Sequence, residues 1–365
     1  MVQILVAAVD FGNFPTRFAK IATLYPTKRI AFSRTNLLDI KPRSLLLVDF
    51  LDLGPDHIRI LREFSRGPQT VPALGIVDTK SRQSVLQARE LGFYNLVDRE
   101  DKFAVLFAKI REIVGDYSKP ALPTRFSEKL VKSVEDSSMG LNLMSAAALS
   151  GAPLPMRLLA TNAKDITSTI MTEGLDNWLS AVQCHHSHTF CHTMMVAGHA
   201  VSFSRSLGHS EADQTLLGLG ALVHDLGKVK IPLTILDKPG KLTKEERELV
   251  DKHPLYSQEI LATRKEVPKQ VVQMALWHHE FLDGSGYPNG LKGNQIPQLV
   301  RLLTISDIFS ALTEKRAYKD SLSPRQAFAI MFEMKGKLDM DLLRKFRTQV
   351  LSSEFGRVRR QARAC

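Results

Sequence analysis

The sequence lacks any long apolar run. Its most apolar stretches, around Leu45–Val48 and Leu216–Val223, fall well short of the about 20 residues that a membrane-spanning helix needs. The amino terminus, MVQILVAAVDFG, has neither the basic region nor the small-residue cleavage site of a signal peptide. We therefore expect no membrane span and a cytoplasmic protein.

Cysteine and acidic residues are also scarce. The spacings of Cys184, Cys191 and Cys365 match no zinc motif and cannot form a disulfide framework, so we interpret them as reduced thiols. The 38 Asp and Glu against 49 Lys and Arg leave a net charge of +11. This excess favours an anionic partner, whether nucleic acid, a phosphorylated small molecule or an acidic surface. Part of it lies in the last ten residues, in a run typical of a solvated tail.

The first 118 residues have the pattern of an α/β domain. At 365 residues the chain is long enough for two domains. In this first part, short apolar runs alternate with segments in which apolar residues recur every three or four positions. The apolar runs are Gln3–Val9, Lys28–Phe32, Ser44–Phe50, Ala73–Val77 and Asn95–Val97. Five strands alternating with helices predict a parallel sheet covered by helices on both faces.

The rest of the chain reads as a linker, a helical domain and a tail. Proline and glycine interrupt the alternation over residues 119–159, around one helical segment near Phe126–Ser137, so we interpret these residues as a linker with helical content. Residues 160–350 are helical in pattern almost throughout, apart from the turn-rich segment Asp283–Pro297 with its four Gly and two Pro. This predicts an all-α second domain, followed by a basic tail over residues 351–365.

The α/β unit resembles the receiver domain of two-component systems, which has a flavodoxin-like parallel sheet. Asp49 ends the third expected strand, SLLLVDF, where receivers carry the aspartate that is phosphorylated. The resemblance implies an acidic pair after the first strand to bind magnesium and a lysine after the fifth. This chain instead has Ala7 and Ala8 after the first strand and Asp98 after the fifth. We therefore expect no phosphorylation of Asp49, and a scaffold or dimerisation role for this degenerate receiver-like domain.

Histidine and aspartate recur through the second domain on apolar backgrounds. Burying an imidazole beside a carboxylate is costly unless both find partners, and so many residues of this kind are hard to satisfy by hydrogen bonds alone. Divalent metal ions would satisfy them together and form a site that holds a phosphate and activates water. Ligation by nitrogen and oxygen without thiolate suits iron or manganese at least as well as zinc. The residues are His192, His224, Asp225, His253, His278, His279 and Asp307.

The order of these residues is that of the HD superfamily of phosphohydrolases, with His224–Asp225 as the defining doublet. The stretch HHEFLDGSGYPNGLKGNQIP over His278–Pro297 resembles the HD-GYP signature HHExxDGxGYPxGLxGxxIP at every fixed position. HDLGKVKIP, LDKPGKLTKEE and SDIFSALTEKRAYKD also fit that family. The resemblance implies that the seven residues above are metal ligands, with two ions bound. His188 stands where some members place an acidic ligand of a third ion, and a role beside the site rather than in it is the alternative.

The resemblance also implies a substrate and its contacts. Tyr287, on the turn-rich loop, would stack on a guanine base, and Arg316 and Lys319 would contact phosphate and guanine. Lys228 would reach the same phosphates or steady the doublet, and His224, Asp225 and Lys228 would form the catalytic group. The implied reaction hydrolyses cyclic di-GMP to linear pGpG, with GMP as an alternative end product.

The sequence leaves two other functions open. The same pocket could serve a cyclic di-GMP receptor with little turnover, or an HD hydrolase that acts on another nucleotide. In each case we expect a nucleotide ligand and no DNA or RNA partner. A homodimer formed through the receiver-like domain or the linker is a further open alternative.

Overall fold

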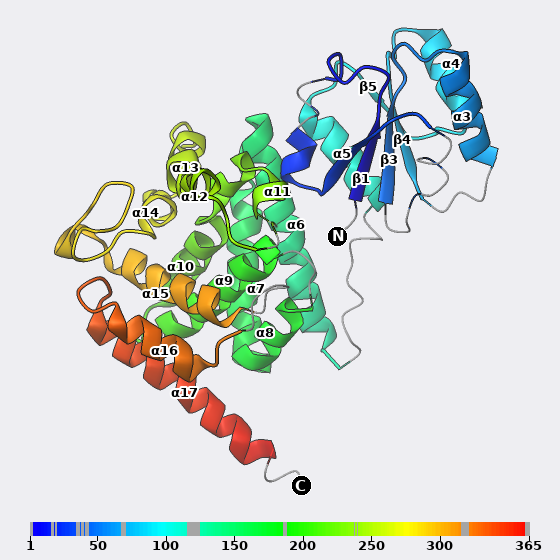
Figure 1. Ribbon diagram of the computed structural model, residues 1–365. Helices are drawn as coiled ribbons and strands as arrows, with labels where there is room; N and C mark the ends of the chain where they lie inside the picture. Colours follow the sequence, from blue (N-terminus) through cyan, green and yellow to red (C-terminus); the bar gives the residue numbers. More distant parts are fainter. Residues whose placement is uncertain are drawn as a thin grey trace. The chain divides into compact units, whose positions relative to one another are not determined.

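The computed structural model separates the chain into two compact units (Figure 1). Unit 1 comprises Met1–Ala121, Ser145–Ala152 and Pro232–Thr234, and unit 2 comprises Leu122–Met144, Pro153–Ile231 and Ile235–Cys365. We describe each unit by itself. The structure describes residues 3–361 except 16–17, 19, 34–36, 38–39, 41–43, 67–70, 115–124, 185–187, 237, 239 and 315–320.

Unit 1 contains a five-stranded parallel sheet, as the sequence predicted. The strand order β2-β1-β3-β4-β5 is that of flavodoxin-like folds. Each expected strand is present, with both ends within two residues of the expected positions. The strands are β1 (Gln3–Ala7), β2 (Thr27–Ile30), β3 (Ser44–Asp49), β4 (Ala73–Val77) and β5 (Leu96–Asp98).

Two apolar cores cover the faces of this sheet. All six residues of the central strand β3 are buried, and successive side chains of a strand point to opposite faces. Leu45 and Leu47 accordingly enter one core, with residues of α5 (Phe103–Val114). Leu46 and Val48 enter the other, with residues of α3 (Pro55–Arg66) and α4 (Arg82–Glu90).

Helix α6 (Glu128–Ser150) corrects the expected linker. The sequence predicted a short helix near Phe126–Ser137, yet the helix continues to Ser150. Ser137, Gly140 and Ser145 weaken helix propensity, but at Gly140 the absent side chain permits close packing, since a Cβ there would lie 2.3 Å from Asn162 Nδ2. Asn162 also donates a hydrogen bond of 3.1 Å to the Asp136 carbonyl. Packing against the next helix therefore outweighs the local preference.

Unit 2 is helical, as predicted. Helices α9, α10 and α15 pack on one another, and α7 and α14 pack on α10. No helix among the described residues is long and apolar enough to cross a membrane. The helices are α7 (Met156–Glu173), α8 (Leu175–Val182), α9 (His188–Ser206), α10 (Glu211–Val223), α12 (Lys244–Asp251), α13 (His253–Leu261), α14 (Lys269–Trp277), α15 (Gln298–Thr313), α16 (Pro324–Glu333) and α17 (Met340–Gln361), with the short α11 (Leu233–Leu236).

The turn-rich segment and the last helix mark two boundaries in unit 2. The turn-rich segment Asp283–Pro297 holds only the 3-10 helix η3 (Gly293–Gln295) and an isolated bridge between Asp283 and Lys292, in agreement with the prediction of a loop. Helix α17 continues to Gln361 and so includes most of the tail that was expected from residue 351.

Candidate metal centre

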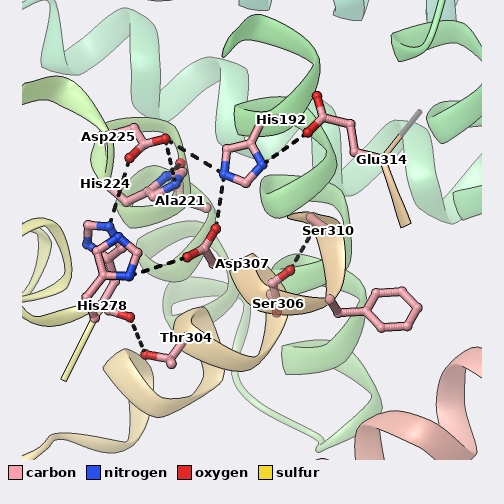
Figure 2. A network of polar contacts seen from close by, with 12 residues as sticks. His192, Ala221, His224, Asp225, His278, Thr304, Ser306, Asp307, Ser310 and Glu314 are labelled. Atoms are coloured by element: carbon pink, nitrogen blue, oxygen red, sulfur yellow. Dashed lines mark hydrogen bonds and ion pairs between the residues drawn. The ribbon is translucent and has the colours of Figure 1, made fainter. Parts of the chain in front are cut away.

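The predicted ligands come from five segments of unit 2 that converge on one place (Figure 2). His192 lies on α9, and Asp307 on α15. His224 is the C-cap of α10, and Asp225 is the N-cap of the 3-10 helix η2 (Leu226–Lys230). The other three are His253, the first residue of α13, and the pair His278–His279 directly after α14. Six are buried and His279 is half-buried.

Close backbone packing positions the doublet. Gly227 touches α13 so closely that a Cβ at this position would lie 1.9 Å from the His253 carbonyl oxygen. Its N–H donates a hydrogen bond of 2.8 Å to Ser257 Oγ. Only glycine permits such an approach, so η2 and the first turn of α13 are fixed against each other. This contact holds Asp225 beside His253.

Asp225 forms the centre of one half of the cluster. Its Oδ1 lies 3.3 Å from His253 Nε2 and 3.9 Å from His278 Nε2. Its Oδ2 lies 3.3 Å from His224 Nε2 and 2.5 Å from Lys228 Nζ. Of the two roles expected for Lys228, the structure places its ammonium on the doublet.

Asp307 forms the centre of the other half. Its Oδ1 lies 3.0 Å from His192 Nε2, and its Oδ2 lies 4.0 Å from His279 Nδ1. His192 Nε2 also lies 3.7 Å from Asp225 Oδ2, so this ring joins the two carboxylates. The structure therefore brings all seven predicted ligands into one cluster.

Backbone carbonyls fix the tautomers of three imidazoles. The Nδ1 atoms of His224, His253 and His278 lie 2.7, 2.8 and 3.1 Å from the carbonyl oxygens of Ala221, Val250 and Met274. A carbonyl oxygen only accepts hydrogen bonds, so each Nδ1 carries a proton, and each ring presents a lone pair at Nε2 when it is neutral. The three Nε2 atoms thus face the two carboxylates.

The charge states agree with a metal-binding donor set. Burial lowers the pKa of His253 to about 3 and that of His278 well below its usual value, so both rings are neutral. Burial alone would raise the pKa of Asp225, but the neighbouring His224 and Lys228 lower it well below the usual range. Burial would also raise the pKa of Asp307, but the hydrogen bond and charge of His192, together with the nearby His279 and His224, lower it below its usual value, so Asp307 is likewise ionised.

One contact tests whether these residues suit a cation. The Nε2 atoms of His253 and His278 lie 3.1 Å apart, and both carry lone pairs because both Nδ1 protons are committed to carbonyls. Two lone pairs at this distance repel each other unless a cation lies beside them. The cluster contains three sets of three residues whose potential ligand atoms lie within 4.8 Å of one another. One of these sets is His253, His278 and His279. The donor set therefore fits divalent metal ions.

Two buried glutamates escaped the sequence analysis. Glu280, 2% exposed, accepts hydrogen bonds from the backbone N–H groups of Asn289 (2.6 Å) and Leu291 (2.9 Å) and so ties down the turn-rich loop. Glu314, 3% exposed, follows the end of α15, and its Oε2 lies 3.7 Å from His192 Nδ1. Glu280 belongs to the HHE motif itself, which was a usable signal. Glu314 lies about two helical turns beyond Asp307, a spacing that places the two acids on one face.

Four expected site residues remain, and the structure describes the side chain of one of them. Tyr287 stacks on the ligand His279, with ring centroids 4.9 Å apart and planes 26° apart, so the aromatic ring borders the cluster. His188 begins α9, one turn before His192, but its side chain is not among those that the structure describes. Arg316 and Lys319 lie outside the described residues.

The receiver-like unit has a cation that the sequence analysis missed. Asp49 forms an ion pair with Arg99, the residue after Asp98, and Arg99 Nη2 also donates a hydrogen bond of 2.7 Å to the Asn13 carbonyl. Asp98 itself accepts a hydrogen bond of 2.7 Å from the Thr79 N–H. The lysine of receivers is thus absent, as the sequence indicated, and Arg99, one position further along, supplies a cation to Asp49 instead.

Comparison with known proteins identifies the domain around the cluster. The HD domain model matches residues 177–342. The cyclic di-GMP phosphodiesterase PA4108 of Pseudomonas aeruginosa is 32% identical over 62% of this chain and 57% of its own length. The 3'3'-cGAMP-specific phosphodiesterase 3 of Vibrio cholerae is 40% identical over 42% of this chain and 33% of its own length. The chain thus spans less than two thirds of these two relatives.

Two further matches extend beyond this domain. The cyclic di-GMP phosphodiesterase response regulator RpfG of Xanthomonas campestris is 29% identical over 80% of this chain and 72% of its own length. Among solved structures, Bd1817, an HDG"Y"P protein from Bdellovibrio bacteriovorus, superposes with a TM-score of 0.50 at 18% identity, over 67% of this chain and 79% of that one. At this identity the likeness supports the fold alone.

Proposed function

From the HD domain that residues 177–342 form, we propose that the chain is a metal-dependent phosphodiesterase that hydrolyses cyclic di-GMP to pGpG. The observation that carries the proposal is the cluster of five imidazoles and two carboxylates, held by buried elements beside the turn-rich loop. The relatives named as cyclic di-GMP phosphodiesterases support the substrate class. Further hydrolysis to GMP is part of the same hypothesis.

The seven ligands would hold two divalent ions, iron or manganese by the chemistry of their nitrogen and oxygen donors. His188, one turn before His192 on α9, is the candidate for a third. When bound, such ions polarise a phosphate and lower the pKa of water. The chain itself supplies the frame: backbone carbonyls fix three rings, and Gly227 fixes the doublet against α13.

The residues around the cluster would bind the nucleotide. Lys228 holds its ammonium 2.5 Å from Asp225, where it can lower the negative charge that an incoming phosphate meets. Tyr287 would present the ring face that is not stacked on His279 to a guanine base. Glu280 keeps this loop closed on the site through two backbone hydrogen bonds. We further propose that Arg316 and Lys319 contact phosphate and guanine, since arginine suits bidentate contacts and lysine a point contact.

A second candidate substrate is 3'3'-cGAMP, because three of the more identical relatives are named for it. It shares the phosphodiester ring and one guanine with cyclic di-GMP, so the metal centre cannot distinguish them. A receptor with little turnover also remains compatible with the same pocket. A turnover assay with both nucleotides, on protein purified without oxygen and loaded with Fe²⁺ or Mn²⁺, decides among the three.

Paired variants separate binding from chemistry in that assay. Loss of one base stack weakens binding by about 1–3 kcal/mol, so Tyr287→Ala should raise KM for the true substrate about ten- to a hundredfold. Tyr287→Phe keeps the ring on His279 and should behave like the unaltered chain. His278→Ala should instead lose metal and turnover together, as judged by metal analysis of the same samples.

Each failure of this assay has a distinct meaning. Loss of metal in Tyr287→Ala would make the tyrosine a support of His279 rather than a nucleotide contact. Tight binding of either nucleotide without hydrolysis by the loaded protein would establish the receptor. If neither nucleotide binds, the assignment to cyclic dinucleotides is wrong.

A further inference from the structure

One imidazole of the cluster has a different partner from the others. His224, His253 and His278 each direct Nδ1 at a backbone carbonyl of their own helix or turn. His192 has no such contact: its Nδ1 is buried and makes no hydrogen bond among the described residues. The nearest charged group to this nitrogen is the Glu314 carboxylate, with Oε2 at 3.7 Å.

The surroundings of His192 show why this matters. Figure 2 shows the ring between two carboxylates, with Asp307 on the side of Nε2 and Glu314 on the side of Nδ1. The Asp307 carboxylate accepts a hydrogen bond from His192 Nε2 at 3.0 Å. In this arrangement the ring proton of His192 therefore lies on Nε2. A metal ion bound at Nε2 needs a lone pair there, and the proton must then reside at Nδ1.

We propose that Glu314 is a positioning residue that holds the Nδ1 proton of His192 when Nε2 ligates a metal ion. Its carboxylate does for His192 what backbone carbonyls do for the other three rings. The separation of 3.7 Å is that of an ion pair, and a small movement of the side chain would shorten it to a hydrogen bond. This inference rests on the proposed metal centre and adds to it a residue outside the ligand set.

A carboxylate also has an effect that a carbonyl lacks. A charged acceptor at Nδ1 makes the imidazole a stronger base and so strengthens its bond to the metal, and removal of such partners commonly costs about ten- to a hundredfold in metal affinity.

The test measures metal binding in the full chain without any nucleotide. Dissociation constants for Mn²⁺ and Fe²⁺ come from competition with a chromophoric chelator, and the melting temperature of the metal-free protein is recorded for each variant. Glu314→Gln keeps the size and removes the charge, and Glu314→Asp keeps the charge on a shorter side chain. Glu280→Gln is the matched control, because Glu280 is equally buried but contacts the loop.

We expect Glu314→Gln to weaken metal binding about ten- to a hundredfold while the metal-free protein melts at the unaltered temperature. Glu314→Asp should lie between Glu314→Gln and the unaltered chain. Glu280→Gln should keep the metal affinity of the unaltered chain, because Glu280 contacts the loop and not a ligand ring.

Two results would overturn the inference. One is unaltered metal affinity in Glu314→Gln. The other is a metal-free protein that melts at a lower temperature in both Glu314 variants, with metal affinity lost equally in both, since that pattern marks a structural role. A chain that binds metal normally but hydrolyses no cyclic dinucleotide would refute the proposed function and leave the role of Glu314 intact.

Discussion

Two buried aspartates, one in each unit, have opposite surroundings. Asp49 at the end of β3 is 2% exposed and Asp225 in the metal cluster is 7% exposed, so both carboxylates are removed from water. Asp49 pairs with the guanidinium of Arg99, a cation that the chain itself supplies. Asp225 has the ammonium of Lys228 but shares its site with a second ionised carboxylate, Asp307, and with imidazoles.

The difference lies in the charge that each site still lacks. A buried carboxylate needs a compensating partner, and at Asp49 the partner is permanent. Asp10, the first acid after β1, is exposed and accepts a hydrogen bond from its neighbour Gly12, so it adds no second carboxylate to a magnesium site there. Around Asp225 the described charges sum to a negative site with several lone pairs, which invites divalent cations. Burial alone therefore does not distinguish the two aspartates; their neighbours do, and these neighbours make Asp225 the one that suits a cation.

The largest expected effect comes from removing the aspartate of the metal cluster. Asp225→Ala should abolish turnover of cyclic di-GMP and lower the bound metal, because this carboxylate lies beside four imidazoles of the cluster. Metal analysis and a turnover assay on the purified protein measure both. Asp49→Asn in the receiver-like unit is the control and should keep full metal content. An Asp225→Ala variant with unaltered metal and rate would show that the site has been assigned wrongly.

The next effect concerns stability of the receiver-like unit. Arg99→Leu leaves Asp49 buried without its partner, which should cost about 3–5 kcal/mol of unfolding free energy. Replacing both residues by leucine should recover most of the loss. The two tryptophans, Trp178 and Trp277, both lie in unit 2, so their fluorescence follows that unit while circular dichroism follows both.

In denaturant, therefore, Arg99→Leu should shift the dichroism transition and leave the fluorescence transition in place. Equal stability of the single and double variants would mean that the ion pair contributes little.

A smaller effect depends on pH and on a histidine outside the metal cluster. His199 on α9 is 3% exposed and packs edge-on against Phe309, with ring centroids 5.0 Å apart. Burial lowers its pKa from 6.5 to about 4. Between these values the unfolded chain takes up a proton that the folded chain does not, so the unfolding free energy should fall as pH decreases from about 6.5 to 4.

The loss should reach about 3 kcal/mol at the acidic end, at about 1.4 kcal/mol per pH unit. His199→Leu removes this contribution, so its unfolding free energy should decline less over the same range. Denaturant titrations of both proteins at several pH values, with metal removed by a chelator, measure the difference. Parallel pH profiles of the two proteins would contradict the expectation.

The last expected result is the absence of phosphorylation at Asp49. Incubation with a small phosphodonor such as acetyl phosphate should leave Asp49 unmodified, because Arg99 occupies the carboxylate and alanines replace the acidic pair. Intact-mass spectrometry checks this. A phosphoaspartate at Asp49 would show that the receiver-like unit retains its switch and would remove the contrast between the two aspartates.

The sequence by itself determined the two fold classes and the residues that would form the cluster. Short apolar runs predicted the five strands to within two residues, because a strand in a covered parallel sheet must be apolar on both faces. The seven expected ligands could be singled out because they are chemically distinctive and stand in a long composite motif. The structure brings these seven residues together, and their role as metal ligands stays a prediction.

Only the tertiary structure decided which partners those residues have. Arg99 at Asp49 and Glu314 at His192 are ordinary charged residues in the sequence, and the HHE motif includes Glu280 without indicating its contact with the loop. The length of α6 was also hidden, because Gly140 and its serines disfavour a helix until α7 packs against them. Contacts between residues far apart in the chain depend on how whole elements pack, and a local pattern carries no record of that packing.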